Sequence, residues 1–190
     1  MKVEELLSWF SMFWDDAGFL SKTHEQKRYD AGRLALKAFY LRAEKEPLPV
    51  SSEKEFKFAV GKNIIRGRFD AIFESGDKVE VVDFKTSNVK KQDEADDRTK
   101  KSTQLATYSL ALRAMTGKLP DEVHLYFVES GLVGTYVPTE KSADKAEAEI
   151  EKAIIGIRAR NYEATPQLFT CKYCPFKYYC PKAILEKTQS

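Results

Sequence analysis

The dipeptide Gly76-Asp77 lies between two segments that are rich in Ile, Val and Phe, and it constrains the fold more than any other part of the chain. The segments, residues 63–75 and 78–84, have the composition of β-strands. A two-residue turn with glycine at its first central position joins antiparallel strands and fixes their register. The sequence therefore predicts a hairpin in which Ser75 lies opposite Lys78.

Counting back from this turn places Asp70 opposite Asp83, and Arg68 opposite Lys85. Alternate residues of a strand point the same way, so these four side chains are expected on one face. Two carboxylates about 5 Å apart at Cβ repel each other unless a cation lies between them. A divalent metal meets this need, and fully hydrated surface aspartates are the alternative. The opposite face is predicted to be apolar and to carry Phe69, Ala71, Phe73, Val82 and Phe84.

The remaining patterns predict a mixed α/β sheet flanked by helices, in one domain of 190 residues. A two-residue turn at Gly61-Lys62 would place Glu55 opposite Arg68, either to orient that arginine toward a phosphate or as an exposed ion pair. We expect the charged segment 88–101 to be turn-like, and to be either mobile until DNA orders it or a plain solvated loop. Helices are predicted at 3–16, 25–45, 103–115 and 142–160, and further strands at 55–60, 123–129 and 132–137.

Composition limits the kind of partner and the compartment. The formal net charge is only +2, so contact with nucleic acid would need a local basic patch. The sequence has no apolar run of transmembrane length and no signal-peptide pattern, so we expect a cytoplasmic protein without membrane contact. The three cysteines, Cys171, Cys174 and Cys180, are clustered, which in a reducing compartment favours metal or iron–sulfur ligation over disulfides.

Four short motifs follow one another in the chain: Gly67-x-x-Asp70, Asp83-x-Lys85-Thr86, Gln104-x-x-x-Tyr108, and the cysteine cluster with Pro175 and Pro181. In this order, over about residues 50 to 181, they resemble the RecB-type nucleases of the PD-(D/E)xK superfamily. That domain occurs in UvrD-like and AddA/AddB-type helicase–nucleases and in CRISPR-associated relatives. The resemblance implies a restriction-endonuclease-like αβββαβ core, with a helical lead-in at 1–50, a nuclease core at 51–165 and a cysteine region at 166–190.

The resemblance also implies roles for individual residues. Asp70, Asp83 and the backbone carbonyl of Phe84 would hold Mg²⁺ or Mn²⁺, and Lys85 would orient the attacking water and stabilise developing negative charge. Gln104 and Tyr108, one helical turn apart, would position the lysine or a substrate phosphate.

Two parts of the family pattern are missing. The expected Gly-x-x-x-His helix does not precede the hairpin: we interpret His24 as a surface residue and His124 as structural. No cysteine precedes Cys171, so the set for a [4Fe–4S] cluster is incomplete, and zinc with another ligand is an alternative. We expect the chain to be a fragment that begins after both features, and a natural variant or a degenerate module are the alternatives.

The sequence thus favours a metal-dependent deoxyribonuclease, of exonuclease type, that cleaves single-stranded DNA in a larger helicase protein of repair and recombination. As a fragment it could lack activity. A noncatalytic DNA-binding module and a zinc-stabilised interaction domain are the competing hypotheses. The predicted contacts to the DNA backbone are the basic residues Arg66, Arg68, Lys90, Lys91, Arg98, Lys100 and Lys101.

Overall fold

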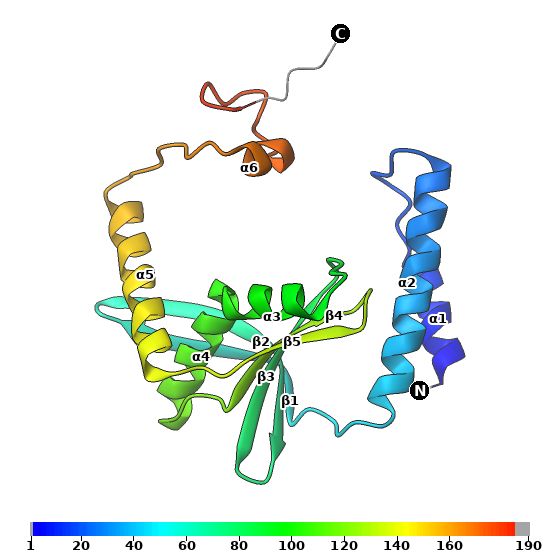
Figure 1. The fold of residues 1–190 in the computed structure, drawn as a ribbon, viewed down its shortest axis with the longest axis horizontal. Coiled ribbons are helices and arrows are strands. Elements are labelled where there is room, and N and C mark those ends of the chain that lie inside the picture. Colours follow the sequence, from blue (N-terminus) through cyan, green and yellow to red (C-terminus); the bar gives the residue numbers. More distant parts are fainter. Residues whose placement is uncertain (1, 185–190) are drawn as a thin grey trace. The chain divides into compact units, whose positions relative to one another are not determined.

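A computed structural model gives the fold and describes residues 2–184 (Figure 1). The chain divides into two compact units, Met1–Glu149 and Ile150–Ser190. The helices are α1 (Val3–Met12), α2 (Lys22–Ala43), α3 (Gln92–Lys100), α4 (Thr103–Thr116), α5 (Glu140–Arg158) and α6 (Leu168–Tyr173). The strands are β1 (Ser51–Val60), β2 (Asn63–Ser75), β3 (Lys78–Lys85), β4 (Glu122–Phe127) and β5 (Leu132–Tyr136).

The strands form one five-stranded sheet in the order β1-β2-β3-β4-β5. Neighbouring strands are antiparallel except β3 and β4, which are parallel. A parallel pair requires a crossover, and here α3 and α4 make the connection between the two strands. The architecture is a mixed sheet flanked by helices, as the sequence predicts, and it fits the restriction-endonuclease-like fold.

Both predicted hairpin registers are confirmed. Gly76 has φ 61°, the left-handed value that a glycine-first turn requires, and Ser75 pairs with Lys78. The β2–β3 ladder continues to the pair Ala71–Val82 and stops one position before Asp70 and Asp83. Glu55 pairs with Arg68 in the β1–β2 ladder.

Helices α4 and α2 contact side chains from different faces of the sheet. On the α4 side, Tyr108 packs against Phe56 and Phe69, with ring centroids 5.8 and 5.2 Å away. On the α2 side, Phe39 packs edge-on against Phe84 of β3, at 5.6 Å. The aromatic contacts anchor α4 over the hairpin, where the candidate site lies.

The predicted alternation of side chains fails at Asp70. Phe69 is fully buried against Tyr108 on the α4 side, whereas Ala71 lines a cavity on the α2 side. The backbone of β1 is also irregular at this level, because Glu53 has φ 54°. Strict alternation therefore holds on either side of Asp70 but not across it, and the prediction that Phe69 and Ala71 share one face is wrong.

Arg68 is affected by the same irregularity. As the neighbour of Phe69, it points away from the α4 side, so it does not share a face with Lys85 as predicted. Its guanidinium makes an exposed ion pair with Glu53, with Nε 2.6 Å from Oε2, although Glu55 is its partner in the ladder. Such an exposed pair contributes less than about 1 kcal/mol.

The segment predicted to be turn-like contains helix α3, which packs on β5. Ala95 and Thr99 are buried, at 0% and 1% exposure, and a Cβ on Gly134 would lie 2.2 Å from the Ala95 carbonyl oxygen. Val89, which precedes the helix, is buried as well. Small residues that permit close approach fix this helix, so the expected charged loop is wrong for residues 92–100.

Unit Ile150–Ser190 contains the end of α5 and helix α6. Cys171 is buried in α6, Cys174 caps the end of this helix, and Cys180 follows it, all as free thiols. Within residues 2–184, no helix is long and apolar enough to cross a bilayer.

Candidate active site

Two side chains from β3 and two from α4 form a closed ring. Lys85 Nζ lies 2.6 Å from Asp83 Oδ2 and donates to Gln104 Oε1 at 2.7 Å. Gln104 Nε2 donates to the Tyr108 hydroxyl at 2.9 Å, and that hydroxyl points back to Asp83 Oδ1 at 3.5 Å, a long and weak contact. The helical spacing of Gln104 and Tyr108 brings both over the strand, so four of the predicted catalytic residues meet.

The hydrogen bonds from Lys85 through Gln104 and Tyr108 to Asp83 all run in one direction. The ammonium group of Lys85 can only donate, so the amide oxygen of Gln104 must face it and the amide nitrogen must face Tyr108. The hydroxyl of Tyr108 then has its proton free for Asp83. One orientation of the Gln104 amide therefore fixes the position of both Lys85 and Tyr108.

Asp83 is the most deeply placed charge of the site, at 1% exposure. Burial raises the pKa of its carboxyl, and the nearby negative charge of Asp70 raises it further, while Lys85 opposes both effects. The ammonium of Lys85 lies 2.6 Å from Oδ2 of Asp83, although no contact of this oxygen within residues 2–184 has hydrogen-bond geometry. A buried carboxylate is costly unless a cation compensates its charge, and the single charge of Lys85 faces the charges of both Asp83 and Asp70.

Asp70 approaches the same place from β2. Its Oδ2 accepts a hydrogen bond from the backbone N–H of Phe84 at 3.0 Å, so the side chain lies along the gap where the β2–β3 ladder has stopped. Asp70 also lines the cavity on the α2 side, and its negative charge is close enough to act on Asp83. The role of the Phe84 carbonyl as a ligand stays a prediction.

Burial and the charges of Asp83 and Asp70 raise the pKa of Tyr108 to about 12, although its hydrogen bond with Gln104 acts in the opposite direction. Tyr108 is therefore a neutral hydrogen-bond donor over the working pH range and cannot act as a general base.

The donor set fits a hard divalent cation. Asp70 and Asp83 supply carboxylate oxygens, the kind of ligand that Mg²⁺ and Mn²⁺ prefer, and the charges of the two are close enough to raise the pKa of Asp83. The ammonium of Lys85, 2.6 Å from Asp83 Oδ2, lowers the pKa of that carboxyl and so opposes the effect of burial.

The predicted DNA-contact residues lie in two places. Arg66 and Arg68 are exposed on β2, and the others are on α3 or next to it. In α3, Arg98 is paired with Glu94 and Lys101 with Asp97, at 2.6 and 2.7 Å. The acidic residues of the helix thus neutralise part of this patch, and its contact with DNA stays a prediction.

The two histidines lie apart from the ring. The backbone N–H of Leu20 donates to Nδ1 of His24, whose ring packs edge-on against Phe19. His124, predicted to be structural, is buried on β4 between Glu80 and Glu122, a cluster that the sequence analysis missed. In the part of the chain that the structure describes, this triad is the one group of three metal-binding side chains brought together, and the cysteines do not form such a group.

Comparison with known proteins agrees with this geometry. The model of the PD-(D/E)XK nuclease superfamily matches residues 1–181, so the chain belongs to this superfamily. Among curated proteins, none matches the sequence significantly.

Two solved structures are similar in fold. One is a protein of Eubacterium rectale provisionally described as an exonuclease, with 14% identity, a TM-score of 0.51, and coverage of 99% of this chain and 76% of that one. The other is SSO0001, with 21% identity, a TM-score of 0.45, and coverage of 96% and 85%.

Proposed function

We propose that this chain is a metal-dependent deoxyribonuclease domain that hydrolyses the phosphodiester bonds of single-stranded DNA. The observation that carries the proposal is the ring of Lys85, Gln104, Tyr108 and Asp83, in which a buried carboxylate, coupled to the charge of Asp70, lies against a lysine. Membership of the nuclease superfamily supports it. Action from a DNA end, as part of a helicase-linked repair protein, is the finer form of the same proposal.

Each residue has a distinct task in this reaction. Asp83 and Asp70 would hold Mg²⁺ or Mn²⁺, which when bound polarises the phosphate and lowers the pKa of water. Lys85 carries a fixed positive charge and donates protons, so it orients the attacking water and stabilises the negative charge that develops on phosphorus-bound oxygens. Gln104 holds the lysine in place, and Tyr108 holds Gln104.

The charge of the chain bears on how DNA would be bound. The net charge of +2 gives no strong field that would draw duplex DNA to the whole surface. Arg66 and Arg68 are exposed on β2, on the face away from Lys85, so they would bind DNA only beyond the ring, and Arg68 would have to leave Glu53 to bind a phosphate. Exchange of one weak ion pair for another costs little.

The test is cleavage of end-labelled oligonucleotides, single-stranded and duplex, with Mg²⁺, Mn²⁺ or EDTA. We expect single-strand cleavage with metal only, and a loss of at least about a hundredfold in Asp83→Asn and in Lys85→Met, with DNA binding retained. Asp77→Asn, in the exposed turn of the same hairpin, is the matched control and should cleave normally.

Circular single-stranded DNA distinguishes an exonuclease from an endonuclease, because an enzyme that needs a DNA end leaves the circle intact. Equal cleavage by wild type and Asp83→Asn would rule out this site. Binding without cleavage under every metal condition would instead support the noncatalytic DNA-binding module.

A further inference from the structure

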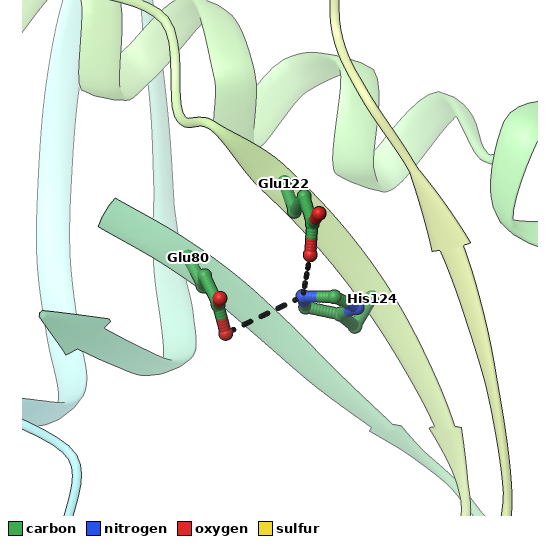
Figure 2. Close-up of side chains that lie close together, drawn as sticks. All are labelled: Glu80, Glu122 and His124. Atoms are coloured by element: carbon green, nitrogen blue, oxygen red, sulfur yellow. Dashed lines mark ion pairs between the residues drawn. The ribbon is translucent and has the colours of Figure 1, made fainter. Parts of the chain in front are cut away.

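Three acidic or imidazole side chains meet on the sheet face opposite Asp83. Glu80 of β3 and Glu122 of β4 are paired directly across the parallel ladder, and His124 follows two residues later on β4. His124 Nε2 lies 3.6 Å from Glu80 Oε2 and 3.6 Å from Glu122 Oε2, and Figure 2 shows the imidazole directed between the two carboxylates.

The His124 imidazole is buried, and one of its two nitrogens has no hydrogen bond among the described residues. His124 is 8% exposed, yet its Nε2 atom makes no hydrogen bond within residues 2–184. Its other nitrogen, Nδ1, lies 3.1 Å from Thr135 Oγ1. With the proton on Nδ1 donated to Thr135, Nε2 presents a buried lone pair toward the carboxylates, which is how metal-binding histidines are held.

The spacing of the three ligand atoms suits a small ion. All lie within 4.8 Å of one another, and the two contacts of Nε2 are 3.6 Å long. In a tetrahedral zinc site with bonds of about 2.1 Å, ligand atoms are about 3.4 Å apart. Only small adjustments of the two glutamates would therefore be needed.

We propose that Glu80, Glu122 and His124 form a second metal site, which takes a zinc-like transition-metal dication. One nitrogen and two carboxylate ligands favour zinc over magnesium, which prefers an all-oxygen octahedral shell. Along β3, Glu80 and Asp83 point to opposite faces of the sheet, so one ion cannot serve both sites. Glu80 and His124 also line a cavity of about 770 Å³, which leaves room for a fourth ligand such as water.

A competing cation is already present. Lys78 Nζ lies 2.7 Å from Glu80 Oε1 and 3.2 Å from Glu122 Oε2. Its ammonium neutralises one of the two negative charges, whereas a dication would neutralise both. The lysine is half-exposed and can move into solvent when a metal binds.

Zinc chloride titration of the 190-residue chain, followed by ¹⁵N NMR of the imidazole nitrogens, tests the proposal. The chain has two histidines, so each ring can be assigned, and His24 serves as an internal control. The background carries C171S, C174S and C180S, so that thiols do not take the metal. We expect zinc to shift the Nε2 resonance of His124 and to leave His24 unchanged.

Variants then separate a metal site from an ordinary ion-pair cluster. Glu122→Gln should weaken zinc binding by about tenfold or more, while Glu74→Gln, an exposed glutamate on the wall of the same cavity, should not change it. Lys78→Gln should tighten binding, by up to about tenfold, because it removes the competing charge. Asp83→Asn should leave the His124 shift intact, so this test is independent of nuclease activity.

The proposal is overturned if zinc does not shift the His124 resonance, or if Glu122→Gln and wild type bind zinc equally. Circular dichroism of each variant checks the fold. Failure of Glu122→Gln to fold would leave the Lys78→Gln comparison as the deciding measurement, and unchanged or weaker zinc binding there would overturn the site.

Discussion

Replacement of Tyr108 by phenylalanine tests whether the ring works as a connected unit. The change removes the hydroxyl and keeps the aromatic packing on Phe56 and Phe69. The lost contacts are a hydrogen bond of 2.9 Å from Gln104 and a weak one of 3.5 Å to Asp83. Gln104 is exposed, so its freed amide can bind water, and only the contact with Asp83 is lost in a buried place.

The size of the effect follows from these contacts. An ordinary hydrogen bond contributes about 1 kcal/mol net, and the long one contributes less, so we expect a loss of about 1 kcal/mol in the free energy of unfolding. Activity should fall by about tenfold, because Gln104 no longer holds Lys85 in place. The hydrogen bond from Tyr108 lowers the pKa of Asp83, so its loss should move the acid limb of the pH–rate profile to higher pH.

Urea unfolding followed by circular dichroism measures the free energy of unfolding. The initial rate of oligonucleotide cleavage, recorded across pH, measures the loss of activity and the shift of the acid limb. Tyr179→Phe is the control, since that tyrosine is 88% exposed. An unchanged acid limb in Tyr108→Phe, together with wild-type activity, would refute the connected ring.

Three further predictions concern stability and local order. The pKa of Asp83 is raised in the folded state, so its contribution to stability is fully present below the unfolded pKa of about 4 and is lost as pH rises through the folded pKa. Urea unfolding at pH 7.5 should therefore find Asp83→Asn at least as stable as wild type. A clear loss of stability in this variant would contradict the reasoning. Gly134→Ala should destabilise the protein by about 1–3 kcal/mol, because its methyl group meets the backbone of Ala95. Gly156→Ala, with open space around it in α5, should stabilise the protein by about 0.5–1 kcal/mol. Thermal melts that rank the two variants the other way would refute the close packing of α3 on β5. Amides of Gln92–Lys100 should be protected from hydrogen exchange without DNA, since α3 is already packed on β5, and rapid exchange there would restore the mobile-loop hypothesis.

Local rules predict the hairpin and the shared helix face of Gln104 and Tyr108, whereas their meeting with Lys85 is implied only by the resemblance to the nuclease family. A glycine-first turn sets the register of Asp83, and helical spacing sets Gln104 and Tyr108 on one side of α4. The side on which Phe69 lies could not be predicted in this way, because a backbone irregularity at Asp70 interrupts the alternation.

Two other features depend on contacts between segments far apart in the chain. Helix α3 is held by Ala95 and Thr99, which are too small to give a clear hydrophobic stripe, and by their close approach to Gly134. The Glu80–Glu122 pairing depends on the parallel register of β3 and β4. A crossover of two helices separates these strands, so no turn motif reveals that register.

The division of the ring between a hairpin and a helix bears on how the protein folds. Asp70, Asp83 and Lys85 are joined by a short antiparallel hairpin, which closes within microseconds, whereas Gln104 and Tyr108 arrive only when α4 docks and β4 completes its parallel pairing. A nascent chain that has made only the hairpin carries two repelling carboxylates and a lysine that lacks its hydrogen bond to Gln104. Under the proposed function, cleavage of DNA would then begin only after α4 docks, so partly folded copies would leave DNA intact.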